Sequence, residues 1–178
     1  VKKLEHKLEQ AKKESKLPKI VIPVHLCGTS CEMKTIKRLA EKYNFRIIED
    51  ASHAIGGKYE DEPVGNCKYS DITVFSFHPV KVITTGEGGM AMTNSTYLAE
   101  EMTLLRSHGI TKDKERFKEE STGPWHYEQQ KLGFNYRMND IEASLGISQL
   151  RRLKEIVETR NEQRDAYIKE LNGCNIEI

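Results

Sequence analysis

An acid, a hydroxyl and an amine occur in order near the ends of two apolar segments. FRIIED (45–50) ends in Asp50, and DITVFSF (71–77) contains Ser76, five residues before Lys81. In an open parallel sheet, the carboxyl ends of the strands meet at one edge, and ligands bind there. If both segments are strands of such a sheet, Asp50, Ser76 and Lys81 share one site.

These side chains suit an aromatic cofactor that carries an aldehyde, a pyridine nitrogen and a phosphate. A lysine among apolar residues can form a Schiff base with the aldehyde. A carboxylate facing the pyridine nitrogen keeps the ring protonated, so that the ring can accept electrons. A hydroxyl can bind the phosphate. Lys81, Asp50 and Ser76 would fill these three roles, and small residues between 51 and 57 leave room beside the acid.

Each of these signals has a simpler explanation when it is taken alone. An aspartate after a buried strand is often only a helix or turn cap, and a serine near a strand end often has no chemical role. A lysine beside apolar residues can simply extend its amine into water. TTGEGG (84–89) lacks the spacing of a phosphate-binding P-loop. The order and spacing of Asp50, Ser76 and Lys81 favour the cofactor interpretation.

Helix and strand patterns alternate along the chain around these residues. This alternation predicts an α/β fold with a mostly parallel sheet. The apolar spacing predicts strands over 19–25, 45–50, 71–77, 82–85 and 88–94, and helices over 1–16, 31–43, 97–106 and 141–171.

Several residues are predicted to end these elements. Asn44 is a plausible C-cap for the second helix, and Asn139 or Asp140 can start the last one, which Gly173 would end. The polar segment 112–131 interrupts the pattern and is predicted to be an excursion or lid.

Composition narrows the classes of function. The 178 residues predict about one domain, or one large piece of a bigger domain. The 28 basic and 27 acidic side chains nearly balance, which argues against nucleic-acid and membrane partners. No apolar run approaches the roughly 20 residues of a membrane-spanning helix, and residues 1–16 lack the apolar core of a secretory signal. The default expectation is a cytoplasmic soluble protein.

The four cysteines are too sparse for a disulfide scaffold. Cys27 and Cys31 are close in sequence, but neither a second cysteine pair nor a histidine cluster completes a zinc site. We therefore expect reduced thiols and no bound metal.

Four motifs together resemble the DegT/DnrJ/StrS aminotransferases. They are IEDASHAIGG (48–57), SDITVFSFHPVKVITTGEGGMAMTN (70–94), RSHGI (106–110) and LGFNYRMNDIEASLGISQL (132–150). These are pyridoxal-phosphate enzymes of the aspartate aminotransferase fold (fold type I), and they act mostly on nucleotide-linked keto-sugars. The resemblance runs from about residue 19 to 173 and implies a three-layer sandwich around a mostly parallel sheet.

The resemblance assigns roles to five residues. Lys81 would form the Schiff base and shuttle the catalytic proton, and Asp50 would face the pyridine nitrogen. His53 matches a Gln or His near the ring and its phenolic oxygen, and Ser76 would bind the cofactor phosphate. Asn135 matches an asparagine that reaches the phosphate of the neighbouring subunit's cofactor, which implies a homodimer with shared active sites.

The resemblance also implies a reaction. The amino donor is usually glutamate, which leaves as 2-oxoglutarate, and the acceptor is a nucleotide-linked keto-sugar. The wording of FHPVK and GEGG looks most like members that aminate a 4-keto-6-deoxy-hexosamine for surface glycans of the pseudaminic-acid type.

The family is longer than this chain, so residues 1–178 are expected to be part of the large, cofactor-binding domain. The amino-terminal part of that domain, with a phosphate-holding loop and a ring-stacking aromatic, and the small carboxy-terminal domain would lie outside it. Such a piece alone is expected to expose sheet edges and apolar faces, and it could lack activity.

Three other functions stay open at this point. A sugar dehydratase branch of the family has histidine in place of the lysine, and Lys81 argues against it. A non-catalytic regulator or binding protein on the same scaffold is a second possibility. A plain dinucleotide-binding domain is a third, but no GxGxxG follows a strand. His78 has no role that the sequence supplies.

Overall fold

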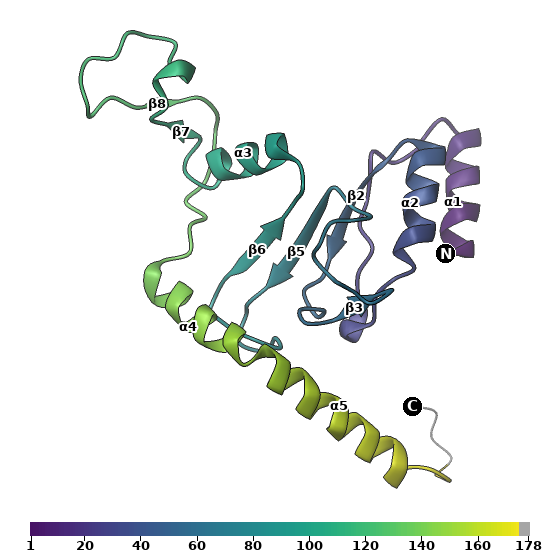
Figure 1. Cartoon of the computed structure of the whole chain (residues 1–178). Helices are drawn as coiled ribbons and strands as arrows, with labels where there is room; N and C mark the ends of the chain where they lie inside the picture. Colours follow the sequence, from purple (N-terminus) through teal and green to yellow (C-terminus); the bar gives the residue numbers. More distant parts are fainter. Residues whose placement is uncertain (175–178) are drawn as a thin grey trace.

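A four-stranded mixed sheet organises the chain in the computed structural model, which describes residues 1–174 (Figure 1). The strands lie in the order β1 (Ile20–Val21), β2 (Arg46–Asp50), β5 (Ile72–Ser76) and β6 (Gly89–Met92). β1 pairs with β2 and β2 with β5 in parallel, whereas β5 pairs with β6 antiparallel. The predicted α/β fold with a mostly parallel sheet is confirmed.

Helices and short hairpins precede, connect and follow these strands. The helices are α1 (Lys2–Lys13), α2 (Met33–Tyr43), α3 (Thr96–Leu105), α4 (Asp140–Arg151) and α5 (Leu153–Glu170), with single 3₁₀ turns η1 (Leu26–Gly28) and η2 (Lys114–Arg116). Two small antiparallel hairpins pair β3 (Lys58–Tyr59) with β4 (Glu62–Pro63), and β7 (Ile110–Thr111) with β8 (Glu128–Gln129).

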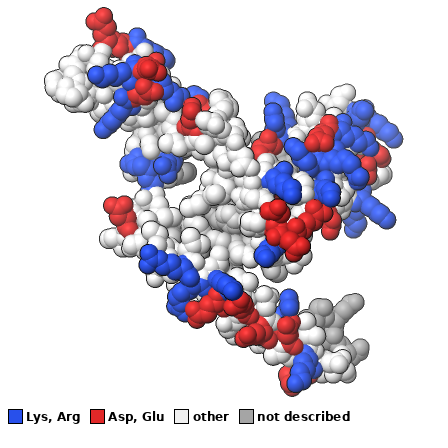
Figure 2. Space-filling view, viewed as in Figure 1, with Lys and Arg blue, Asp and Glu red and all other residues white. Residues whose placement is uncertain are grey.

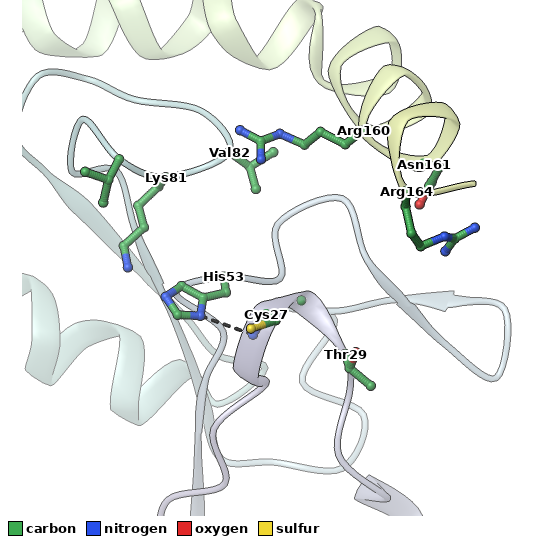
Figure 3. Close-up of a pocket in the computed structure, with 10 residues that line it drawn as sticks. Cys27, Thr29, His53, Lys81, Val82, Arg160, Asn161 and Arg164 are labelled. Carbon is green, nitrogen blue, oxygen red and sulfur yellow. Dashed lines mark hydrogen bonds between the residues drawn. The ribbon is translucent and has the colours of Figure 1, made fainter. Parts of the chain in front are cut away.

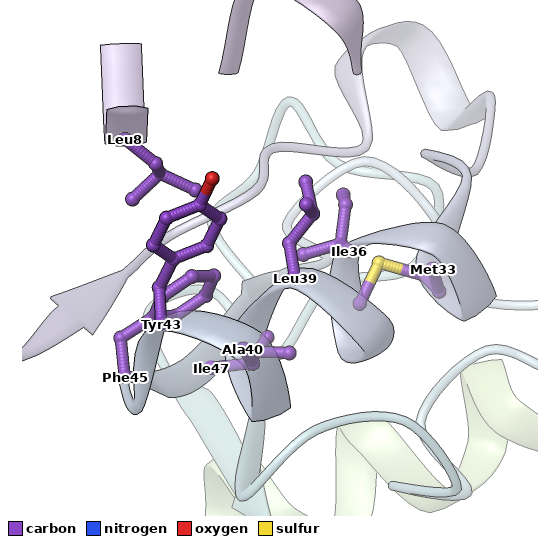
Figure 4. Close-up of a cluster of buried hydrophobic side chains, with 8 residues drawn as sticks. All are labelled: Leu8, Met33, Ile36, Leu39, Ala40, Tyr43, Phe45 and Ile47. Carbon is purple, nitrogen blue, oxygen red and sulfur yellow. The ribbon is translucent and has the colours of Figure 1, made fainter. Parts of the chain in front are cut away.

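The core of the amino-terminal half forms on one face of α2. The apolar side chains of α2 recur at helical spacing, and every one of them is buried. They pack with Leu8 of α1 and with Phe45 and Ile47 around β2 (Figure 4). Asn44 ends the helix in the left-handed conformation, with φ of 56°, and its N–H donates to the carbonyl of Ala40. The predicted C-cap is therefore confirmed.

The last predicted helix is divided in two. Asn139 starts α4 with a capping box: its Oδ1 accepts from the N–H of Glu142 at 2.9 Å, and the Glu142 carboxylate accepts from the N–H of Asn139 at 3.1 Å. The chain then breaks at Arg152, and α5 ends at Glu170 with Leu171 as its C-cap. Gly173 follows the end with a positive φ of 92° and is not the cap itself.

The predicted strand over 82–85 is wrong. This segment folds back on the end of β5 instead of pairing with a neighbouring strand. The Thr85 N–H donates to the carbonyl of Phe77 at 3.0 Å, and the Thr84 hydroxyl donates to the same carbonyl at 2.9 Å. Its β-branched residues serve a turn that carries the chain from β5 back to the antiparallel β6. The polar segment 112–131 holds η2 and β8, and its role as a lid stays a prediction.

Helices cover one face of the sheet. Strand alternation and the register Glu49↔Thr73 put Ile47 and Glu49 of β2 on the same face as Thr73 and Phe75 of β5. Ile47 belongs to the cluster built on α2, and Phe75 belongs to a second cluster that packs against Leu153 and Ile156 of α5. Both helical packings therefore lie on this face.

The opposite face carries exposed apolar side chains. Register places Ile20, Ile22, Val24 and Val74 on this face, and they are 48%, 57%, 47% and 37% exposed. Large exposed apolar patches are typical of interaction surfaces. We call these four residues the open face. The third layer of the predicted sandwich would cover it and stays a prediction.

Basic and acidic side chains mix over the helical end and over α5, while the middle of the same view is nearly uncharged (Figure 2). Among residues 1–174, none of the helices combines the length and the apolar character that crossing a bilayer requires.

Candidate functional site

A cavity of about 610 Å³ lies among η1, the turn after β2, the loop after β5 and α5. Its volume falls in the range of small-molecule sites, roughly 300–1,000 Å³. The residues that line it are Cys27, Gly28, Thr29, His53, Val80, Lys81, Val82, Arg160, Asn161 and Arg164 (Figure 3).

Asp50 ends β2 as an ionised carboxylate. Its Oδ1 accepts hydrogen bonds from the Ser52 hydroxyl at 2.6 Å and from the Ser52 N–H at 3.1 Å. The bond from the Ser52 hydroxyl lowers the pKa of Asp50, and the nearby Lys81 ammonium lowers it further, against partial burial. Asp50 thus caps a turn, as the simpler explanation expects, but within residues 1–174 its Oδ2 accepts no hydrogen bond.

Lys81 extends its side chain from the loop after β5. The loop is shaped by His78: the Lys81 N–H donates to the His78 carbonyl at 2.9 Å, and the Val80 N–H donates to His78 Nδ1 at 3.3 Å. His78 therefore acquires a role in loop geometry. Lys81 is half-buried, and its amine is directed toward the ring of His53 (Figure 3).

His53 lies between Lys81 and the backbone of η1. Its Nδ1 accepts a hydrogen bond from the Cys27 N–H at 3.3 Å. A nitrogen that accepts carries no proton, so the neutral ring is protonated at Nε2. His53 therefore offers a hydrogen-bond donor on the atom that does not contact η1.

Ser76 lies at the end of β5, on the same face of the sheet as Asp50. Its Oγ accepts from the His78 N–H at 3.4 Å, which leaves the hydroxyl proton free to donate. Ser76 does not line the cavity itself. Its predicted contact with a phosphate stays a prediction.

Asn135 is not brought to this cavity. It lies in the segment between β8 and α4, is exposed, and pairs with Ser107 in an isolated antiparallel bridge. Asp50, His53, Ser76 and Lys81 thus lie around the ends of β2 and β5, while Asn135 lies apart from them.

Residues 1–178 match the sequence profile of the DegT/DnrJ/EryC1/StrS aminotransferase family over their whole length. The chain belongs to this family.

Two relatives in the family are named for reactions on nucleotide-linked sugars. The UDP-4-amino-4,6-dideoxy-N-acetyl-beta-L-altrosamine transaminase of Campylobacter jejuni is 43% identical over 169 residues, which are 95% of this chain and 41% of the transaminase. GDP-perosamine synthase of Caulobacter vibrioides is 39% identical over 142 residues, 80% of this chain and 35% of the synthase.

Solved structures of aminotransferases share the fold. Helicobacter pylori PseC, an aminotransferase involved in the biosynthesis of pseudoaminic acid, superposes with a TM-score of 0.78 at 33% identity, over 88% of this chain and 39% of PseC. A DegT DnrJ EryC1 StrS aminotransferase from Brucella abortus superposes with a TM-score of 0.82 at 30% identity, over 97% of this chain and 43% of that one. The chain therefore spans about two fifths of the length of such relatives.

Aminotransferases of the DegT family depend on pyridoxal phosphate, and structures of a putative sugar aminotransferase from Streptococcus pneumoniae include PLP and PMP forms. The residues of this chain fit that cofactor. Asp50 is ionised, and among residues 1–174 only its Oδ1 receives hydrogen bonds, so Oδ2 is available to a protonated pyridine nitrogen. Lys81 brings a primary amine into a cavity of suitable size.

Sequence reasoning missed two walls of the cavity. The loop Cys27–Thr29 turns through left-handed conformations, with φ of 54° at Cys27 and 86° at Gly28, which apolar periodicity does not reveal. Arg160 and Arg164 come from α5, one helical turn apart. Their spacing of four residues was the available signal, because such residues share a helix face. Arg164 donates to Asp165 at 2.7 Å, whereas Arg160 reaches over the cavity (Figure 3).

Ser52→Ala is expected to raise the pKa of Asp50 toward its ordinary value, because the hydroxyl donor is lost. A lowered carboxyl pKa contributes stability above the unfolded-state pKa, and this contribution disappears as the pH falls through the folded-state pKa. Acidification should therefore destabilise the variant less than it destabilises the parent protein. Carboxyl ¹³C NMR titration of Asp50 measures the shift. Ser52→Thr, which keeps a hydroxyl, is the control, and an unchanged pKa in Ser52→Ala would refute the assignment.

Proposed function

We propose that the complete protein is a pyridoxal-phosphate-dependent aminotransferase that moves an amino group from glutamate to a nucleotide-linked keto-sugar. The observation that carries this proposal is the arrangement of Lys81 and His53 in one cavity, with the ionised Asp50 close enough for the charge of Lys81 to lower its pKa. Family membership supports the reaction class.

When bound, pyridoxal phosphate supplies an electron sink for the carbon that loses its proton. Asp50 would hold a proton on the pyridine nitrogen. Lys81 would bind the aldehyde carbon and then move protons at the substrate carbon, first as base and then as acid. His53 would donate from Nε2 to the phenolic oxygen, and Ser76 would donate its hydroxyl proton to the phosphate.

The substrate is proposed to be a 4-keto-6-deoxy-hexosamine linked to a nucleotide, and the product an amino sugar for surface glycans. Support comes from the names of the Campylobacter jejuni transaminase and of a spore coat polysaccharide biosynthesis protein of Bacillus subtilis that is 37% identical over 84% of this chain and 38% of that protein. Arg160 supports an anionic substrate, because a guanidinium is suited to the paired oxygens of a diphosphate or carboxylate.

The protein is further proposed to act as a homodimer in which Asn135 reaches the cofactor phosphate of the partner subunit. This would account for an exposed asparagine that lies apart from its own cavity. A cytoplasmic location remains a prediction.

Residues 1–178 are proposed to form part of the large domain. Two apolar regions support this. One is the open face, and the other is a cavity of about 530 Å³ between α4 and the sheet, where Phe75, Met90 and Leu150 are among the lining residues. Chain outside residues 1–178 would cover both.

A dehydratase of this family is disfavoured because Lys81 occupies the position of its histidine. A non-catalytic protein on the same scaffold is the remaining alternative. Assay of the complete protein with glutamate and a panel of nucleotide-linked keto-sugars separates the two, because only the aminotransferase forms an amino sugar and 2-oxoglutarate. No turnover with any member, despite bound cofactor, would contradict the proposal.

Asp50→Asn is expected to lower the transamination rate by about 10²–10⁴-fold, the range for loss of a positioned proton-transfer group. Stability should change little, because an asparagine oxygen can still accept from Ser52. Asp71→Asn is the matched control: Asp71 accepts from the Ile47 N–H at 2.9 Å and from Arg46 at 3.0 Å, so its loss should affect stability more than rate. If Asp50→Asn lost enough folding stability to account for its loss of rate, Asp50 would be a turn cap alone.

Ile22→Lys is expected to destabilise the complete protein by roughly 3–5 kcal/mol, because an uncompensated buried charge costs about that much. The residue is 57% exposed here, so the penalty arises only if further chain covers the open face. Gln10→Lys, on the exposed side of α1, should stay within about 0.5 kcal/mol of the parent. Urea unfolding measures both. Matching stabilities of Ile22→Lys and Gln10→Lys would show that nothing covers this face.

A further inference from the structure

A buried hydrogen-bonded pair, His25 and Glu49, lies next to the loop that lines the cavity and does not line the cavity itself. His25 follows β1 and is 0% exposed, and Glu49 of β2 is 6% exposed. Their side chains meet at 2.8 Å between Nε2 and Oε2. Oε1 of Glu49 accepts from the Thr73 hydroxyl at 3.0 Å and from the Ser70 hydroxyl. Burying such groups costs free energy unless each is hydrogen-bonded, and here the polar atoms of both side chains have partners.

The hydrogen bonds fix the protonation of both partners. The Cys31 N–H donates to His25 Nδ1 at 3.2 Å, so the proton of the neutral ring is on Nε2 and is donated to Glu49. Burial alone would raise the pKa of Glu49, but the bonds from His25, Ser70 and Thr73 outweigh burial and lower it. Glu49 is therefore a carboxylate with three donors.

This pair anchors both ends of the loop that lines the cavity. His25 begins the loop, and its own N–H donates to the Asp50 carbonyl at 3.0 Å. Cys31 ends the loop, and its N–H is held by His25 Nδ1. Between them, Cys27 adopts a left-handed φ of 54°, which costs free energy for a residue other than glycine. The anchors hold the loop in this strained form.

The strained loop reaches the candidate catalytic groups through one bond. The Cys27 N–H donates to Nδ1 of His53, whose ring faces the amine of Lys81 (Figure 3). The tautomer of a histidine is set by the bond that its other nitrogen makes. The loop thus decides which nitrogen of His53 offers a proton to the cavity.

We propose that His25 and Glu49 are positioning residues that hold the loop 26–30 so that its backbone keeps His53 in the Nε2–H form beside Lys81. The consequence for catalysis rests on the proposed function, because it requires a cofactor oxygen opposite Nε2. The tautomer itself does not, and it can be measured without cofactor.

The ring ¹⁵N shifts of selectively labelled histidine test the proposal in the complete, cofactor-free protein. Solid-state spectra avoid the size limit, and His53→Gln assigns the signals. The parent should show one protonated and one unprotonated nitrogen at His53. His25→Ala should give a mixture of both tautomers. A mixture in the parent, or an unchanged His53 in folded His25→Ala, would overturn the proposal.

Two further variants separate positioning from general stability. Gly28→Ala leaves the buried pair intact but places a Cβ 3.1 Å from the His53 carbonyl at a φ of 86°, so it should also mix the tautomers, and it remains informative if His25→Ala does not fold. Leu39→Ala removes a buried side chain of the α2 core and should lower the melting temperature while leaving His53 unchanged. If Leu39→Ala also gives a mixture of His53 tautomers, His25 and Glu49 contribute only to general stability.

Glu49→Gln tests whether hydrogen bonds or charge do the positioning. The amide oxygen can accept from His25, and the hydroxyls of Ser70 and Thr73 can rotate to accept from the amide nitrogen. The variant should therefore keep the Nε2–H form of His53. Loss of that form in Glu49→Gln would overturn the hydrogen-bond account.

Cofactor affinity supplies a second readout. His25→Ala should weaken pyridoxal phosphate binding in proportion to the fraction of His53 that leaves the Nε2–H form, up to the roughly tenfold factor of one lost hydrogen bond, whereas Leu39→Ala should leave the affinity unchanged. Titration of the visible absorption band measures both. Equal weakening in the two variants would contradict the positioning role. A parent protein that binds no cofactor would instead refute the proposed function and leave the ¹⁵N result standing.

Discussion

Parallel pairing of β2 with β5 is the constraint on which the rest of the structure depends. The register Asp50↔Val74 places the last residue of β2 two residues before the end of β5, which is Ser76. Residues that are 31 positions apart in sequence, Asp50 and Lys81, consequently approach closely enough for the charge of one to affect the pKa of the other. A shift of one residue would turn Asp50 toward the opposite face, because side chains alternate along a strand.

The two faces of this sheet have different functions. The helical face buries Ile47 and Phe75, and it also carries the Glu49 carboxylate that supports the loop lining the cavity. Asp50 and Ser76 lie on the other face, beside the exposed apolar residues. The structural anchor and the proposed chemistry therefore occupy adjacent positions in sequence, Glu49 and Asp50, that point to opposite sides of one strand.

The apolar spacing within short segments predicted most of the helices and strands. It could not predict which residues from distant parts of the sequence pair with each other. The strand ends located Asp50 and Lys81, and the caps at Asn44 and Asn139 followed from local side-chain chemistry. The strand prediction for residues 82–85 was wrong because a β-branched run was read as a strand, although its hydrogen-bond partner is Phe77, which directly follows β5. The His25–Glu49 pair spans 24 residues and has no periodic signal. The role of Asn135 came from family resemblance alone and stays a prediction.

The most direct test of the central claim is to locate the covalent attachment of the cofactor. The complete protein is loaded with pyridoxal phosphate and reduced with borohydride, and its peptides are mapped by mass spectrometry. The account predicts a pyridoxyl group on Lys81, and no such group and no visible absorption band in Lys81→Ala. A label on another lysine, or an unchanged band in Lys81→Ala, would contradict it.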